Sequence, residues 1–294
     1  MDKCFFPQIV HTWMYGDVEF EKVAASLREA GADGADIGIT LQGRKNGPEA
    51  LERTDLRGIL ARENLKPLCV TPLCNHPELD LSHPDDKIRD HALGFAVRGL
   101  DIAVQAGSDR MMIPPTWFSV RQSLHKSYEE DFARATDSLA RLAGEASRRR
   151  LLLLLEPINR FRVSLVHTVA EARRMLDAIG MDNLGIAGDT YHMNMEEGQG
   201  VPSAILAAGP LLRCLHIGEN NRKPPGFGSL DWKAVLGALK AIGFSGPLSH
   251  EPVFLYFSEQ RVASDPEYHR YFQRLLGHGI KTLRGIMEAL DDLP

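Results

Sequence analysis

The chain has 294 residues, of which 44% are hydrophobic and 25% are charged, and its formal net charge is −5. This composition excludes a disordered chain, and the mild negative charge argues against a nucleic-acid binder, which would carry a basic face. No apolar stretch approaches the roughly 18 residues that a membrane span needs, so we expect no membrane partner. Because the N-terminus shows no secretion signal and only four cysteines are present, we expect a cytoplasmic protein without a disulfide framework.

Short β-rich runs alternate with longer amphipathic stretches along the whole chain. Eight strands are predicted, at Pro7–Trp13, Ala35–Thr40, Pro67–Leu73, Arg110–Pro114, Leu151–Ile158, Leu184–Asp189, Arg213–Ile217 and Pro247–Pro252. Eight helices are predicted between and after them, at Val18–Ala30, Pro48–Glu63, Asp85–Ala106, Ser127–Arg149, Thr168–Ile179, Val201–Ala208, Asp231–Ile242 and Tyr268–Leu290. The five leucines 151–155 do not alternate with polar residues, which is typical of a strand covered on both faces.

Eight successive βα units predict an α/β protein with the fold of a (β/α)₈ TIM barrel, for which about 250 residues are typical. A doubly wound open sheet is the competing architecture. It would carry a glycine-rich phosphate turn after the first strand, whereas that turn reads TWMYGD here. Since no linker or composition break interrupts the alternation, we predict a single domain over residues 1–294.

Four consecutive predicted strands each end on a side chain that can bind a metal ion: Glu156, Asp189, His216 and Glu251. Barrel active sites lie at the carboxyl ends of the strands, so the four residues are expected at the same height. Each residue alone could simply be a polar strand end. Three carboxylates around one rim are costly to bury without a cation, however. An oxygen-rich set with one imidazole suits Mn²⁺ or Mg²⁺, and Co²⁺ or Zn²⁺ can also be accommodated.

The segments EPINRF, GDTYHMN, HIGENNRKPPG and GFGSLDW resemble the sugar isomerase/epimerase barrels of the xylose-isomerase-like superfamily. Within it, they are most similar to the D-tagatose 3-epimerase/D-psicose 3-epimerase group. The resemblance implies one divalent metal ion held by Glu156, Asp189, His216 and Glu251. It implies Glu156 and Glu251 as the acid/base pair, and His192 and Arg222 as ligands of substrate oxygens. It also implies a homo-oligomer, either a dimer or a tetramer.

The chemistry of such a site is proton transfer at a carbon next to a carbonyl group. A metal ion stabilises the enediolate that forms, and a carboxylate removes the proton. Return of the proton from the other face gives an epimer of a ketose or sugar-derived acid, and return to the adjacent carbon gives an isomer. A dehydratase or lyase acting on a keto-sugar or inositol-like substrate would use the same metal site and is the alternative. A nuclease would need more histidine ligands, and a non-catalytic barrel would not need both glutamates.

Two positions depart from the family pattern. Members of the epimerase group usually carry a glutamate six residues after the first catalytic glutamate, where this chain has Arg162. Many also carry a carboxylate at the end of the second strand, where the matching stretch ADIGIT has Ile39. Arg162 is either a solvated loop residue or, with Arg222 and Lys223, part of a pocket for an anionic substrate. Further candidates for substrate contact are Trp13 and Trp117, just past the first and fourth strands, with packing as the alternative.

Overall fold

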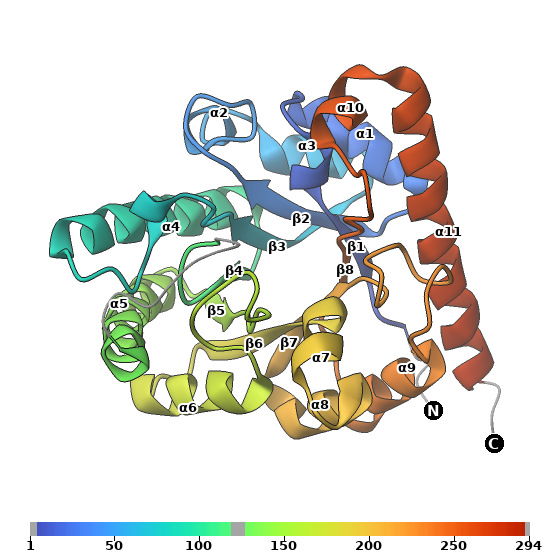
Figure 1. Cartoon of the computed structure of the whole chain (residues 1–294). Helices are drawn as coiled ribbons and strands as arrows, with labels where there is room; N and C mark the ends of the chain where they lie inside the picture. The colour runs from blue at the N-terminus through green and yellow to red at the C-terminus, as the bar shows by residue number, and fades with distance from the viewer. Residues whose placement is uncertain (1–4, 119–126, 292–294) are drawn as a thin grey trace.

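Eight parallel strands close into a barrel in the computed structural model, which describes residues 5–118 and 127–291 (Figure 1). The strands pair in chain order, and β1 pairs with β8 to close the sheet. Their bounds are Gln8–His11 (β1), Gly34–Ile39 (β2), Lys66–Pro72 (β3), Arg110–Ile113 (β4), Leu152–Leu155 (β5), Leu184–Asp189 (β6), Leu212–Ile217 (β7) and Leu248–His250 (β8). The predicted TIM barrel is confirmed, and every predicted strand is present. Strand β6 has the predicted bounds, β7 begins one residue earlier, and the other strands are shorter or shifted by one residue.

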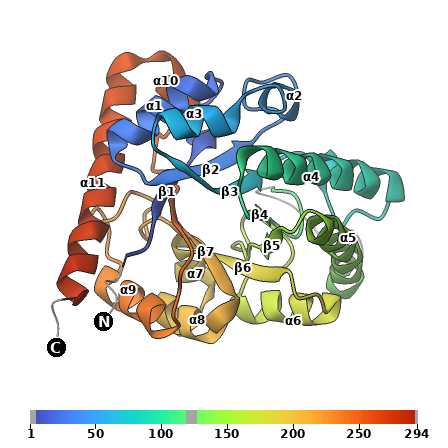
Figure 2. The same ribbon diagram turned by 180° about the vertical axis from the view of Figure 1, so that it is seen from behind.

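Helices surround the barrel on its outside, as both views show (Figures 1 and 2). The α-helices are Phe20–Ala30 (α1), Pro48–Leu51 (α2), Leu56–Arg62 (α3), Asp86–Ala106 (α4), Tyr128–Arg148 (α5), Val169–Ile179 (α6), Thr190–Glu196 (α7), Gly200–Ala208 (α8), Trp232–Ala241 (α9), Glu259–Ser264 (α10) and Pro266–Asp291 (α11). Short 3₁₀ turns lie at Thr12–Tyr15, Pro77–Leu79 and Gly209–Leu211. Helix α11 packs against both α1 and α9, and so it covers the seam where β1 meets β8.

The prediction of one continuous helix over Pro48–Glu63 is wrong, because two helices, α2 and α3, occupy that stretch with a break between them. Asp55 begins the second helix as its N-cap, and its carboxylate accepts a hydrogen bond from the backbone N–H of Gly58. An aspartate satisfies the free N–H groups of a new helix better than it continues an old one. The short helices α7 and α10 were not predicted from the sequence.

The barrel interior is divided into an apolar floor and a polar upper layer. Six buried side chains from six different strands pack as one cluster inside the barrel: Ile9, Cys69, Met112, Leu154, Ala187 and Cys214. The larger core lies between the strands and the surrounding helices. Leucines 153 and 155 of β5 belong to that outer core, whereas Leu154 faces the interior, which explains why the leucine run has no polar alternation.

None of the helices among the described residues combines the length and the apolar character that a membrane crossing requires.

Candidate metal and substrate site

A cavity of about 200 Å³ opens at the carboxyl ends of the strands. Above the apolar floor, most of its lining is polar or aromatic. The lining residues are His11, Trp13, Thr71, Leu73, Asn75, Phe118, Glu156, Ile158, Arg162, His192, His216, Arg222, Glu251 and Val253. They include all the predicted substrate and metal residues except Asp189, Trp117 and Lys223.

The four predicted metal ligands come together around this cavity. Candidate ligand atoms of Asp189, His216 and Glu251 lie within 4.8 Å of one another, and so do those of Glu156, Asp189 and His192. His216 Nδ1 lies 3.3 Å from Glu156 Oε1 and 3.8 Å from Glu251 Oε2, and so it sits between the two glutamates. Glu156 follows β5 and Glu251 follows β8, and the two carboxylates therefore approach from separate parts of the barrel wall.

The two ring nitrogens of His216 have different surroundings. Nε2 lies 3.1 Å from Asp36 Oδ2 in a buried hydrogen bond. Nδ1 is buried and has no hydrogen-bond partner among the described residues. A histidine that donates one N–H to a carboxylate keeps its other nitrogen free as a metal ligand, which is the usual arrangement around bound cations. The unpaired Nδ1 between two carboxylates therefore fits a cation site.

Strand β2 does supply a carboxylate to the site, contrary to the expectation based on Ile39. Asp36, in the middle of β2, is fully buried and faces the interior, whereas Ile39 packs in the outer core. Asp36 also accepts hydrogen bonds from Thr71 Oγ1 at 2.7 Å and Ser249 Oγ at 2.9 Å. The sequence signal was available, since Asp36 is the one acid within the otherwise apolar run GADIGI.

The two carboxylate oxygens of Asp189 have different roles, since one caps a helix and the other faces the site. Oδ1 caps α7 by accepting hydrogen bonds from the backbone N–H groups of Tyr191 and His192. Oδ2 faces the site, 3.6 Å from His192 Nε2 and 3.8 Å from Arg222 Nη2. The end of β6 and the start of α7 thus hold one oxygen of this side chain toward the cavity.

The two candidate catalytic glutamates differ strongly in protonation when no cation is bound. Burial raises the pKa of Glu156 to about 7. Burial also opposes ionisation of Glu251, but Arg222, His216 and His11 outweigh it, and the pKa of Glu251 falls to about 2. Burial opposes the charged form of His216 as well, yet Glu156 and Asp36 raise its pKa well above the ordinary value. Without a cation, His216 and the proton on Glu156 offset the negative charge of the site.

Cation binding is expected to release about one proton more at pH 6 than at pH 8, because Glu156 must lose its proton before it binds. Protonation of Glu156 alone should make the affinity for Mn²⁺ about tenfold lower at pH 6 than at pH 8. In the ion-free protein, the same shift lowers the free energy of unfolding as pH rises from about 4.5 to about 7, because the unfolded chain releases that proton first. Titration calorimetry in buffers of different ionisation enthalpy measures the proton release. Equal release at both pH values would contradict the protonated state of Glu156.

The predicted substrate residues are placed at different depths. His192 is buried, and its ring lines the cavity. Arg222 Nη2 lies 2.9 Å from Glu251 Oε2, and its guanidinium stacks over the Tyr191 ring. Arg162 is exposed at the mouth of the cavity, 5.9 Å from the centre of the Phe118 ring. Trp117 is half-buried and does not line the cavity, whereas its neighbour Phe118 does.

Two further residues of the site, His11 and Asn159, were not predicted from the sequence, and Trp13 was predicted only as a candidate for substrate contact. His11 at the end of β1 is fully buried, and neither ring nitrogen has a hydrogen-bond partner among the described residues. A Cβ atom on Gly38 would lie 2.8 Å from its ring, so the glycine of β2 makes room for it. Trp13 donates a hydrogen bond of 2.8 Å to Glu251 Oε1. Asn159 contacts His192. The position of His11 at the carboxyl end of the first strand is the sequence signal that could have indicated it.

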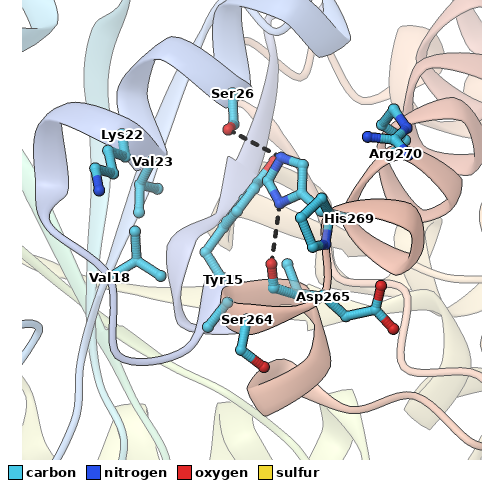
Figure 3. A pocket seen from close by; sticks show the side chains of 12 residues that line it. Tyr15, Val18, Lys22, Val23, Ser26, Ser264, Asp265, His269 and Arg270 are labelled. Carbon is cyan, nitrogen blue, oxygen red and sulfur yellow. Dashed lines mark hydrogen bonds between the residues drawn. The ribbon is translucent and has the colours of Figure 1, made fainter.

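A second cavity, of about 370 Å³, lies between α1 and the helices α10 and α11 (Figure 3). The imidazole of His269 is the central polar group of this cavity, and both of its nitrogens already have partners. Nδ1 lies 3.0 Å from the carbonyl oxygen of Val262, and Nε2 lies 3.3 Å from Ser26 Oγ. The barrel-mouth cavity has clustered carboxylates and imidazole nitrogens that form no hydrogen bond within the described part of the chain, and it is therefore the candidate functional site.

Comparison with known proteins supports the fold over most of the chain. A family model described as the xylose isomerase-like TIM barrel matches residues 24–270. The solved structure of an L-ribulose 3-epimerase superposes with a TM-score of 0.82, covering 97% of this chain and 95% of that one at 21% identity. Because the two sequences are only 21% identical, this superposition is evidence for the fold alone.

Two curated relatives match parts of the sequence. The 3-dehydro-D-guloside 4-epimerase of Escherichia coli (strain K12) is 32% identical over 159 residues, which cover 52% of this chain and 60% of the relative. The D-psicose 3-epimerase of Agrobacterium fabrum is 36% identical over 122 residues, which cover 42% of each chain. The chain thus spans about half the length of the curated relatives that it matches.

Proposed function

Because the chain belongs to the xylose isomerase-like TIM-barrel family, we propose that it is a divalent-cation-dependent epimerase or isomerase of a ketose or sugar-derived acid. The observation that carries the proposal is the arrangement around His216. Its buried Nδ1 forms no hydrogen bond among the described residues and lies between the carboxylates of Glu156 and Glu251, in a cavity open to small molecules. Several curated relatives are named as epimerases of ketoses or keto-glycosides, which supports the same reaction class.

Glu156, Asp189, His216 and Glu251 are the residues that would hold the cation, with Mn²⁺ or Mg²⁺ favoured by their oxygen-rich set. When bound, the cation would polarise the carbonyl group of the substrate and stabilise the negative charge of an enediolate. Asp36 would accept a hydrogen bond from the Nε2–H of His216, which leaves Nδ1 to bind the cation.

Glu156 and Glu251 would move the proton. One carboxylate takes it from the carbon next to the carbonyl group, and the other returns a proton from the opposite side, which inverts that carbon. Trp13 and Arg222 hold Glu251 through hydrogen bonds of 2.8 Å and 2.9 Å to its two oxygens. Their donation keeps this carboxylate in one orientation, as a proton-transfer group requires.

The test is deuterium exchange in D₂O with Mn²⁺, using a panel of ketoses and sugar acids. We expect deuterium at a single carbon and a product of the same mass apart from the label. Loss of water from the product would instead indicate the dehydratase or lyase alternative. Absence of exchange with every compound, in protein shown to contain the cation, would contradict the proposal.

Arg162 is expected to favour an anionic substrate, because among the described residues its guanidinium forms no ion pair and it lines the cavity close to Arg222. Partial loss of hydration and the nearby Arg222 lower its pKa, and a substrate carboxylate would offset both effects. Since Arg162 is exposed, solvent screens the attraction between its guanidinium and a substrate carboxylate. We therefore expect only about a tenfold preference in kcat/KM for a sugar acid over D-tagatose. Arg162→Glu should abolish it.

Lys223→Glu is the matched control for this prediction, because Lys223 is exposed nearby but does not line the cavity. It makes the same change of charge and should leave the preference unchanged. If the parent prefers the neutral sugar and Arg162→Glu leaves kcat/KM unaltered, Arg162 is a solvated loop residue.

A further inference from the structure

Asn159 and His192 form a buried pair at the edge of the cavity. Asn159 lies in the loop after β5 and is 1% exposed, and His192 lies in the first turn of α7 and is 4% exposed. Asn159 Nδ2 is 2.7 Å from His192 Nδ1. The neighbouring strands β5 and β6 bring these two segments together.

The orientation of the Asn159 amide follows from its other contact. The backbone N–H of Phe161 donates to Asn159 Oδ1 at 3.1 Å. The backbone carbonyl of Asn159 accepts from the N–H groups of Arg162 and Val163, which holds the turn in place. Because a backbone N–H can only donate, the amide oxygen faces Phe161 and the NH₂ group faces His192.

This orientation determines which nitrogen of His192 carries the proton. An NH₂ group only donates, so Nδ1 must accept and cannot itself be protonated. The proton of the ring is therefore on Nε2. Nε2 lies 3.6 Å from Asp189 Oδ2, which is longer than a normal N–H···O hydrogen bond, and the ring lines the cavity. The Nε2–H group is thus available to a ligand.

We infer that Asn159 is a positioning residue that holds His192 as the Nε2–H tautomer, so that the ring donates a hydrogen bond to a substrate oxygen on which negative charge develops. The inference rests on the proposed function for the identity of that oxygen. A neutral imidazole held in one tautomer is a suitable donor at such a place, because its proton is already aimed where the charge appears.

The first test is ¹⁵N NMR of histidine-labelled protein, with the His192 signals assigned by comparison with His192→Phe. We expect a protonated Nε2 and an unprotonated Nδ1. A proton on Nδ1 in the parent protein would overturn the inference. This measurement needs no turnover, so it stands apart from the deuterium-exchange test of the proposed function. It also needs no variant of Asn159 that folds.

The second test is Asn159→Asp, which keeps the shape but puts a carboxylate oxygen against Nδ1. We expect the Nδ1 signal to move into the protonated range. Asn75→Asp also adds a negative charge at the cavity. Among the described residues no hydrogen bond joins Asn75 to His192, whose Nδ1 contacts Asn159, so this control should leave the signal in place. An unmoved signal in Asn159→Asp, or an equal shift in the control, would overturn the inference.

A third test, by steady-state kinetics, distinguishes a positioning role of Asn159 from a general structural role. We expect Asn159→Asp to lower kcat about 10- to 100-fold with little change in KM, because the donated hydrogen bond matters most as charge develops. In a His192→Phe background, the same substitution should cause no further loss, since Asn159 acts through His192. An equal loss of kcat in both backgrounds would overturn the inference.

Discussion

Glu156→Gln and Glu251→Gln are each expected to lower kcat by about 10³-fold. An amide of the same shape can still ligate weakly through its oxygen, but it cannot accept or deliver a proton. Both side chains line the cavity, and His216 lies between them at 3.3 Å and 3.8 Å. Steady-state kinetics with the substrate found by deuterium exchange measure the loss, and the metal content of each variant is measured in parallel.

The matched control is Glu49→Gln, because Glu49 pairs with Arg98 on the outer helices and does not line the cavity. It should retain the parental kcat. If either cavity variant kept the parental rate of C–H exchange with its cation bound, that glutamate would not be a proton-transfer group.

His216→Ala is expected to remove most of the bound cation, and Asp36→Asn to weaken cation binding about 10- to 100-fold. The first variant deletes the only nitrogen in the proposed ligand set. The second leaves the imidazole but weakens the hydrogen bond that holds Nε2–H, so Nδ1 is no longer held as the free nitrogen. Titration calorimetry with Mn²⁺ gives both affinities. Chelation should lower the Tm of the parent protein more than that of His216→Ala, since bound cation stabilises only the native state.

His250→Gln is the control for these two variants. His250 is buried next in the chain to Glu251, but its ring faces the other side of β8 and bonds to Gln8 Oε1 at 2.8 Å. It should keep its cation. Loss of cation from His250→Gln to the same extent as from His216→Ala would mean that disturbed packing, rather than a missing ligand, causes the effect.

The barrel and the set of residues at its mouth could be predicted from the sequence, because both depend on local patterns. Apolar runs of strand length alternate with helical periodicity, and a parallel strand brings its carboxyl end to the same rim each time. For this reason the sequence alone predicts that Glu156, Asp189, His216 and Glu251 lie together. The gathering of these side chains at one rim follows from the strand order itself.

The helix break at Asp55 and the extra helix α7 were less predictable, because caps compete with helix periodicity on a scale of about 1 kcal/mol. Asp189 illustrates the difficulty. The same carboxylate ends β6, caps α7 and faces the site with its second oxygen. The sequence shows the residue, but the division of its oxygens is a property of the turn that follows the strand.

The pairings within the site were decided only by the tertiary structure. Asp36 and His216 are 180 residues apart, and Trp13 and Glu251 are 238 apart, yet each pair forms a hydrogen bond. Such contacts depend on the stagger of neighbouring strands and on which face each residue presents, since a shift of one residue reverses the face. The sequence therefore determined which groups meet at the barrel mouth, whereas closure of the sheet decided which nitrogen, which oxygen and which proton face one another.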